Sequence, residues 1–224
     1  MAQPSLRLVV LISGNGSNLQ AMLDARDSEL SAAKICGVVS DNPDAFGLTR
    51  AQQAAVPTAV VSRSEFSDRQ AFDRRIGELI DDFAADLVVL AGFMRILGTG
   101  LVDAYRGRMV NIHPSLLPRY RGLHTHRRAL ENGDTLHGTS VHFVTPELDG
   151  GPVIAQAEVA VRPDDDEAML SARVQQREYI LYPRVINWIG TGRLMWNGAV
   201  PQFDGRPLEK PIVWKHQSGP DSLP

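Results

Sequence analysis

The sequence predicts an α/β fold with a mostly parallel sheet flanked by helices. Short apolar runs such as 6–13 contain almost no polar residue, which is typical of strands that are covered on both faces. Segments with helical spacing of apolar residues alternate with these runs over the first half of the chain. After residue 138 the pattern changes to two strand-like runs joined by a glycine-containing turn, which predicts antiparallel strands in the C-terminal half.

In the first half each predicted strand is followed by a predicted helix. The expected strands are 6–13, 35–40, 58–61, 87–91 and 109–112. The expected helices are 19–30, 45–55, 67–84 and 101–105. The third of these helices has a capping-box pattern, in which Ser67 is the expected N-cap and Gln70 reaches back to it.

The second half begins with a loop, 117–122, that contains proline and arginine and is a candidate lid. A helix over 124–132, strands over 139–144 and 153–161, and a long helix capped by Asp164 and running to about 189 follow. We expect one domain over 1–196. The stretch 197–224 is rich in Pro, Gly and charge, and it is expected either as part of the same domain or as a peripheral extension.

Composition narrows the class of protein. The 23 basic and 26 acidic residues nearly balance, so no nucleic-acid or membrane partner is expected. Cys36 is the single cysteine and has no partner for an internal disulfide, which is compatible with a reducing compartment. The apolar run 8–12 is too short for a signal sequence or a membrane span. These observations predict a soluble cytoplasmic protein.

The strand that ends at residue 112 is followed by a chemically distinctive pair. Side chains alternate along a strand, so Asn111 and His113 should point the same way. A donor amide beside a titratable ring suits a reaction in which negative charge develops on oxygen. Taken alone, such a pair is more often a buried polar contact that neighbouring groups satisfy.

The loop Gly14-Asn15-Gly16-Ser17-Asn18 lies between a buried strand and a helix, where unpaired N–H groups and the helix dipole favour an anion. A single phosphate suits this loop best. A dinucleotide site is the alternative, but Leu19 stands where its third glycine would be. A purely structural turn also stays open.

Asp149 precedes Gly150 and Gly151, where an aspartate is usually a turn residue. Ligands of open α/β sheets bind beyond the carboxyl ends of the strands, so Asp149 should meet Asn111 and His113 there. Its carboxylate would orient and charge His113 and accept protons. The pair His124 and His126 lacks a third ligand at a convincing spacing, and we therefore predict no metal.

Five motifs together resemble the family of folate-dependent phosphoribosylglycinamide formyltransferases of purine biosynthesis. They are 11–20, 90–97, 111–118, 137–144 and 147–154, and the similarity extends in order over 6–196. The resemblance implies a single-domain, Rossmann-like formyltransferase fold. It also implies that 10-formyltetrahydrofolate is the co-substrate and phosphoribosylglycinamide the acceptor, and it leaves open whether the chain forms a homodimer.

The resemblance also assigns residues. Asn111, His113 and Asp149 match the catalytic trio. Positions matching the ribonucleotide site are Gly16, Ser17, Asn18, Gln175 and Glu178. Positions around the folate are Arg69, Met94, Arg95, Ile96, Leu97, Asn111, Thr145, Leu148 and Asp149. Arg69 and Arg95 are candidates for the folate carboxylates.

Two residues depart from the family pattern. Arg177 stands where a polar uncharged residue is expected, and Pro146 where an acidic one is expected, which affects fine specificity but not the trio. Other members of the fold, a tRNA formyltransferase or a formyltetrahydrofolate deformylase, would carry an additional domain that this sequence does not suggest. A nucleotide-binding oxidoreductase and a non-catalytic phosphosugar-binding protein are the alternatives from other classes.

Overall fold

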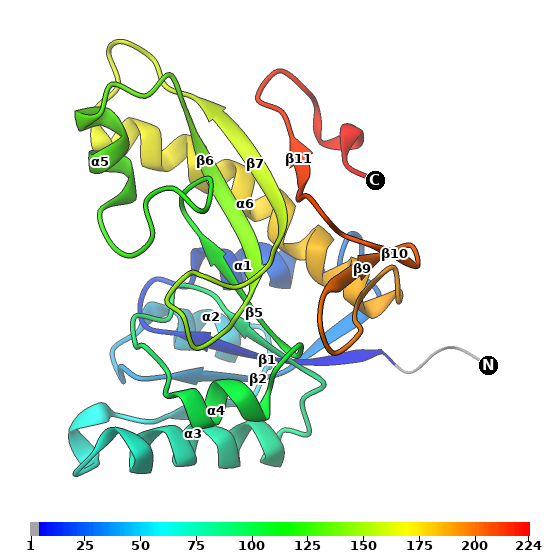
Figure 1. Ribbon diagram of the computed structural model, residues 1–224. Helices are drawn as coiled ribbons and strands as arrows, with labels where there is room; N and C mark the ends of the chain where they lie inside the picture. The colour runs from blue at the N-terminus through cyan, green and yellow to red at the C-terminus, as the bar shows by residue number, and fades with distance from the viewer. Residues whose placement is uncertain (1–4) are drawn as a thin grey trace.

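The computed structural model describes residues 5–224 and shows an eight-stranded sheet covered by helices on both faces (Figure 1). Its strand order is β11-β7-β6-β5-β4-β1-β2-β3. The pairs among β1 to β5 are parallel, whereas β6 is antiparallel to both β5 and β7. The predicted α/β class, with antiparallel strands in the C-terminal half, is confirmed.

The first half of the chain alternates strands and helices as expected. The strands are β1 Leu6–Ile12, β2 Ala33–Ser40, β3 Thr58–Val60, β4 Leu87–Leu90 and β5 Met109–His113. The helices are α1 Ser17–Asp24, α2 Phe46–Gln53, α3 Arg69–Asp82 and α4 Thr99–Ala104, with a 3-10 turn at Arg63–Glu65.

The second half contains the long helix and the remaining strands. Its elements are α5 Thr125–Glu131, β6 Leu136–Phe143, β7 Val153–Ala160, α6 Glu167–Gly190, β8 Leu194–Trp196, β9 Pro201–Phe203, β10 Arg206–Pro207, β11 Ile212–Trp214 and a 3-10 turn at Pro220–Ser222. Strands β8 to β10 form a small antiparallel sheet, and β11 joins the large sheet beside β7.

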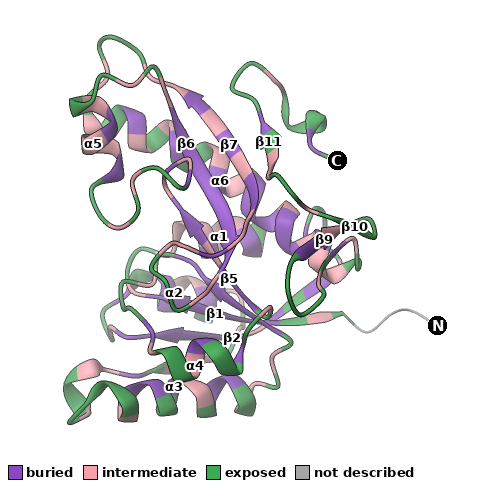
Figure 2. Cartoon of the chain, viewed as in Figure 1, coloured by how far each residue is buried: buried purple, intermediate pink, exposed green. Residues whose placement is uncertain are grey.

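Two apolar layers sandwich the sheet, and alternate residues of one strand contribute to each. Leu8, Val10 and Ile12 of β1 pack with α1, α2 and α6, while Val9 and Leu11 pack with α3 and α4. Figure 2 shows the central strands as almost entirely buried. Burial on both faces explains why these strands are continuous apolar runs in the sequence.

The C-terminal stretch packs on the rest of the molecule. Trp214 is 2% exposed, and the Arg177 guanidinium lies 3.9 Å from the centre of its indole ring. The guanidinium also donates to the carbonyl of His216 at 2.9 Å. Arg177 therefore contacts this stretch.

Three local predictions are corrected by the structure. The helix expected to reach residue 30 ends at Asp24, because the Ala25 carbonyl accepts from both Ser28 and Leu30 in tight turns. The N-cap of α3 is Asp68 and not Ser67, since the Asp68 carboxylate accepts from Ala71 N–H at 2.8 Å.

The N-cap of α6 is likewise displaced within a run of three aspartates. Asp166, and not Asp164, accepts from Met169 N–H at 2.7 Å. Its neighbour Asp165 accepts from the Arg162 N–H and pairs with Arg173, so the run is divided between a cap and an ion pair. In both helices, the residue directly before the first turn provides the cap.

Candidate active site

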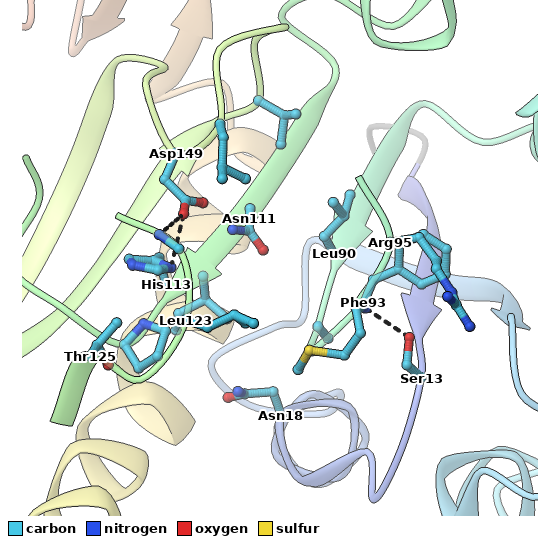
Figure 3. A pocket seen from close by; sticks show the side chains of 18 of the residues that line it. Ser13, Asn18, Leu90, Phe93, Arg95, Asn111, His113, Leu123, Thr125 and Asp149 are labelled. Atoms are coloured by element: carbon cyan, nitrogen blue, oxygen red, sulfur yellow. Dashed lines mark hydrogen bonds and ion pairs between the residues drawn. The ribbon is translucent and has the colours of Figure 1, made fainter. Parts of the chain in front are cut away.

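A cleft of ≈ 680 Å³ opens beyond the carboxyl ends of β1, β4 and β5 (Figure 3). One wall is formed by 13–18 and 90–97, and the other by 111–114, 122–126, 142 and 144–149. This is the position that the topology of an open α/β sheet favours for a ligand.

Strand β5 presents Asn111 and His113 to this cleft. The strand lies between β4 and β6, which pair with it on either side. The two side chains point to the same face because they are two residues apart on a regular strand. His113 is nevertheless 6% exposed, so protein atoms cover most of its surface.

His142 of β6 orients the amide of Asn111. The two residues are opposite each other in the antiparallel register, and Asn111 Nδ2 lies 3.1 Å from His142 Nε2. The His142 Nδ1 lies 2.9 Å from the Phe143 carbonyl, which can only accept, so Nδ1 carries the hydrogen and Nε2 accepts from Asn111. Burial lowers the pKa of His142, which favours the neutral ring. Asn111 therefore retains a second Nδ2 hydrogen that His142 does not use.

The ring of His113 is fixed in the same way. Its Nε2 lies 2.8 Å from the carbonyl of Tyr120, so Nε2 must carry a hydrogen. Its Nδ1 lies 3.5 Å from Asp149 Oδ2. Protonation of His113 would therefore place a new N–H at Nδ1, directed toward the carboxylate and the cleft.

Asp149 is held at the tip of the turn between β6 and β7. Its backbone is left-handed, with φ 47°, and its Oδ2 accepts from Gly122 N–H at 2.9 Å. The turn packs so closely on β6 that a Cβ at Gly151 would lie 1.8 Å from the Phe143 carbonyl oxygen. Gly151 is thus required by packing, and it sets the position of the carboxylate.

The loop 117–122, a candidate lid, lies against both catalytic candidates. The Tyr120 carbonyl bonds to His113, and the Gly122 N–H bonds to Asp149. The Tyr120 hydroxyl in turn donates a hydrogen bond to Asp134 Oδ2 at 2.6 Å. The loop thus contributes backbone groups to the site.

The glycine loop occupies the other wall. Gly16 has a left-handed backbone, φ 69°, and α1 begins at the next residue. A Cβ at Gly16 would lie 2.7 Å from the Cα of Gly47, and the Gly47 N–H donates to the Gly14 carbonyl at 3.0 Å. Arg50 also donates to the Asn15 carbonyl at 2.9 Å. The start of α2 therefore holds this loop in shape.

Glu178 of α6 connects the glycine loop to β6. Its Oε2 accepts from Asn18 Nδ2 at 2.9 Å, and its Oε1 lies 3.1 Å from the Thr139 hydroxyl oxygen. Glu178 is 5% exposed, and burial raises its pKa. Gln175, one turn earlier on α6, also lines the cleft.

The segment 93–97 forms an apolar part of the cleft. Its Met94 N–H donates to Ser13 Oγ at 2.8 Å, while the side chains of Met94 and Ile96 are 68% and 61% exposed. Exposed apolar side chains gathered in a cleft are typical of a ligand site. The Arg95 guanidinium, a candidate for a folate carboxylate, lies 2.5 Å from the buried Asp41 carboxylate.

The cleft brings together nearly all the residues predicted for the site. They are Gly16, Ser17, Asn18, Met94, Arg95, Ile96, Leu97, Asn111, His113, Thr145, Leu148, Asp149, Gln175 and Glu178. Arg69 does not line the cleft. It lies in the first turn of α3, is half exposed, and is 3.7 Å from Asp73.

Sequence reasoning missed three groups that contact the predicted trio. They are the His142 ring, the Tyr120 carbonyl and the Gly122 N–H. The register of β5 against β6 would have identified His142, because it places that residue opposite Asn111. Every residue has the same backbone groups, so the sequence does not reveal that the Tyr120 carbonyl and the Gly122 N–H bond to the trio.

Within residues 5–224, no cluster of three or more His, Cys, Asp or Glu side chains is arranged to hold a metal ion. Over the same range, no helix is both long and apolar enough to cross a membrane.

Comparison with known proteins was made for both sequence and structure. Residues 6–186 match the model of the family described as formyl transferase. The chain is 55% identical over 203 residues to the phosphoribosylglycinamide formyltransferase of Escherichia coli, covering 91% of this chain and 96% of the relative. It is 46% identical to that of Haemophilus influenzae, with coverage of 91% and 96%.

Solved structures give the same picture. The phosphoribosylglycinamide formyltransferase of Coxiella burnetii superposes with a TM-score of 0.90 at 48% identity, covering 94% of this chain and all of that one. That of Anaplasma phagocytophilum superposes with a TM-score of 0.85 at 35% identity, covering 96% and 100% of the two chains. Sequence and fold thus agree over almost the whole chain.

Proposed function

The chain belongs to the formyl transferase family, and from this premise we propose how its cleft carries out the phosphoribosylglycinamide formyltransferase reaction. The enzyme transfers a formyl group to the amine of phosphoribosylglycinamide, a step of de novo purine biosynthesis. The formyl donor is 10-formyltetrahydrofolate, which the apolar part of the cleft suits. The observation that carries the assignment of roles is the convergence of Asn111, His113 and Asp149 on one cleft wall, across from the glycine loop.

The glycine loop is the phosphate site. The N–H groups of Gly16, Ser17 and Asn18 stand at the start of α1, where the helix dipole favours an anion. Glu178 and Gln175 line the neighbouring part of the cleft and bind the sugar. The ribonucleotide amine is then directed from the glycine loop toward Asn111.

The folate occupies the apolar part of the cleft. Residues that border it are Met94, Arg95, Ile96, Leu97, Thr145 and Leu148. Their apolar side chains cover the faces of the pterin, and backbone groups of 93–97 meet its polar rim. Arg69 lies outside the cleft, where it is available to a glutamate carboxylate that extends past the rim.

The reaction begins when the amine attacks the formyl carbon. A C–N bond forms, and the carbonyl oxygen becomes an oxyanion. The second Nδ2 hydrogen of Asn111 donates to this oxygen, and protonated His113 donates from Nδ1, because its Nε2 hydrogen is held by Tyr120. One preorganised donor of this kind is typically worth ~3–4 kcal/mol in the barrier.

Asp149 acts as the proton acceptor and stabilises the charged form of His113. Its carboxylate stands 3.5 Å from His113 Nδ1, stabilises the imidazolium, and accepts the proton of the attacking amine through a water molecule. The tetrahedral intermediate then collapses as the C–N bond to the folate breaks, and the folate nitrogen takes up a proton. Both substrates are bound together, so proximity makes a covalent enzyme intermediate unnecessary.

An assay of folate turnover with phosphoribosylglycinamide tests this proposal directly, when Asn111→Ala and His113→Ala are run beside the parent enzyme. We expect turnover in the parent, a large loss in both variants, and sequential kinetics. A parent enzyme without turnover would reject the function. A ping-pong pattern would reject the direct transfer.

A further inference from the structure

A chain of hydrogen bonds runs through the interior from the glycine loop to His113. Asn18 Nδ2 lies 2.9 Å from Glu178 Oε2, and Glu178 Oε1 lies 3.1 Å from the Thr139 hydroxyl. The same hydroxyl lies 2.9 Å from the carbonyl oxygen of His113. Thr139 is 0% exposed and Glu178 is 5% exposed, so the part of this chain from Glu178 to His113 is buried.

The protons of this chain can be counted. A threonine hydroxyl has one hydrogen to donate, and the His113 carbonyl can only accept it. An ionised Glu178 would also only accept. The carboxylate oxygen, the hydroxyl oxygen and the carbonyl oxygen would then share the single hydrogen of Thr139. The His113 carbonyl accepts from the Ser115 N–H at 2.8 Å, and the Thr139 hydroxyl lies nearer to this carbonyl, at 2.9 Å, than to Glu178, at 3.1 Å. The shorter contact favours the threonine hydrogen on the carbonyl. The remaining contact is satisfied when Glu178 itself carries a hydrogen.

The count also selects the orientation of the Asn18 amide. With Nδ2 toward Glu178, the amide donates to Oε2 and the acid donates from Oε1. With the amide reversed, its oxygen would face Oε2, and the single hydrogen of the acid could satisfy only one of its two contacts. The orientation with Nδ2 toward Glu178 is therefore the one in which a neutral acid satisfies every contact.

The surroundings of Glu178 contain no charge that would stabilise a carboxylate. Within residues 5–224 it forms no ion pair, and its polar neighbours are Asn18 from the glycine loop and Thr139 from β6. Tyr182, one turn later on α6, directs its hydroxyl to the Leu90 and Val110 carbonyls instead. Burial raises the pKa of Glu178 in agreement with this environment.

We propose that Glu178 is a neutral carboxylic acid in the ligand-free enzyme, that it donates its proton to Thr139, and that Thr139 is a positioning residue which connects the phosphate loop to the backbone of His113. The chain has a direction, since each group donates to the next and the last acceptor is the carbonyl of a catalytic candidate. Its role in turnover rests on the function proposed above.

A neutral Glu178 also removes an electrostatic conflict. Asn18 belongs to the loop that would hold a phosphate, so an ionised carboxylate bonded to Asn18 would repel the ligand. A carboxylic acid both donates and accepts, which suits the vicinal hydroxyl groups of a ribose. Replacing Glu178 by Gln should therefore leave the affinity for inorganic phosphate within about twofold. An ionised Glu178 predicts instead that the same substitution tightens phosphate binding.

The protonation state is tested on the ligand-free protein by infrared difference spectroscopy at neutral pH. Subtracting the spectrum of Glu178→Gln from that of the parent should show the carbonyl stretch of a protonated carboxylic acid. Carboxylate bands in its place would overturn the proposal. If Glu178→Gln does not fold, Thr139→Val provides the second measurement. Loss of the acceptor should shift the acid band, and an unshifted spectrum would overturn the proposal equally.

The positioning role is tested with Thr139→Val, and Thr139→Ser is the matched control that restores the hydroxyl. We expect kcat to fall about tenfold in the valine variant, with little change in the KM for the ribonucleotide, and to recover in the serine variant. The nitrogen chemical shifts of the His113 ring should change in the valine variant and return to the parent values in the serine variant. This measurement does not require turnover. Unchanged shifts and kcat in Thr139→Val would show that Thr139 does not position His113, even if the reaction proves to be a different one.

Discussion

The two walls of the cleft are built in different ways. The phosphate wall is one contiguous loop, 14–18, whose binding groups are backbone N–H groups kept in place by the start of α2. The catalytic wall combines side chains from β5 and from the turn after β6 with backbone groups of the loop 117–122. A contiguous site depends on glycine and backbone shape, whereas an assembled site depends on the register of strands that are distant in sequence.

This difference predicts which kinetic constant changes when residues of each wall are substituted. Damage to the catalytic wall should reduce kcat while both substrates still bind, because its groups act on charges that develop during the reaction. Damage to the phosphate wall should raise the KM of the ribonucleotide and spare kcat. Three kinetic experiments test that division, and a fourth compares how the stability of the protein depends on pH.

The largest effect is expected for Asp149→Asn. The amide keeps the size of the side chain but loses the charge beside His113 Nδ1 and the proton acceptor, so kcat should fall ~10²–10⁴-fold. Ligand titrations should show that both substrates still bind. Near-normal turnover in this variant would remove Asp149 from the catalytic role.

Asn111→Ala should come next, with a loss of ~10²–10³-fold in kcat, since it deletes an oxyanion donor. His142→Phe should cost about tenfold, because it removes only the acceptor that orients the Asn111 amide. Steady-state kinetics of the two variants and the double variant measure this. A loss in His142→Phe as large as in Asn111→Ala would mean that His142 acts on the reacting atoms.

Strand β6, which pairs with β5 behind the catalytic wall, should make the stability of the fold sensitive to acid. His137 of β6 is 1% exposed, and burial lowers its pKa to about 4 from an ordinary value of 6.5. Between these two values the unfolded chain binds more protons than the folded one, so stability should decrease as the pH falls. The decrease amounts to roughly 3 kcal/mol at about 1.4 kcal/mol per pH unit.

Denaturant unfolding of the parent and of His137→Phe at several pH values from neutral to pH 4 measures this effect. The variant should have a flatter profile, because the titrating ring is gone. The phosphate loop 14–18 contains no histidine, so its variants should retain the slope of the parent. Parallel profiles for parent and His137→Phe would contradict the assignment.

At the phosphate wall the expected effect is on substrate binding, with turnover preserved. Gly16→Ala introduces a Cβ at a left-handed position, 2.7 Å from the Gly47 Cα, and should raise the KM of the ribonucleotide about tenfold with kcat preserved. Gly14→Ala is the matched control, since a Cβ there meets nothing within 4 Å. If both substitutions had the same effect, loop shape would not determine phosphate affinity.

Much of the fold was predictable because burial on both faces produces a continuous apolar run. The β1 sequence is such a run, and its alternate residues serve two cores. Helix starts were less predictable where several capping residues are adjacent. Ser67 and Asp68 are both good caps, as are Asp164 and Asp166, and only tertiary contacts such as Asp165 with Arg173 decide between them.

The same reasoning explains what could be predicted of the site. Asn111, His113 and the glycine loop lie at strand ends, so chain topology alone brings them to one cleft. His142 was passed over because its role depends on the β5–β6 register, which no local pattern fixes. The contact between Arg95 and Asp41 was missed for the same reason, because the two residues follow strands that are not neighbours in sequence.

The outer strands of the large sheet have a consequence for self-association. Strands β3 and β11 are the two edge strands of the large sheet, and each is three residues long. A proline precedes each of them, Pro57 before β3 and Pro211 before β11. Short edge strands next to proline, with Lys210 and Lys215 beside β11, are poor templates for pairing with another chain. Strand β7, by contrast, has eight residues, and only β11 covers its outer side. Strand β11 pairs with Ala155, Gln156 and Ala157 in the middle of β7, so a chain shortened before Pro211 would leave the outer edge of β7 unpaired and should self-associate more readily.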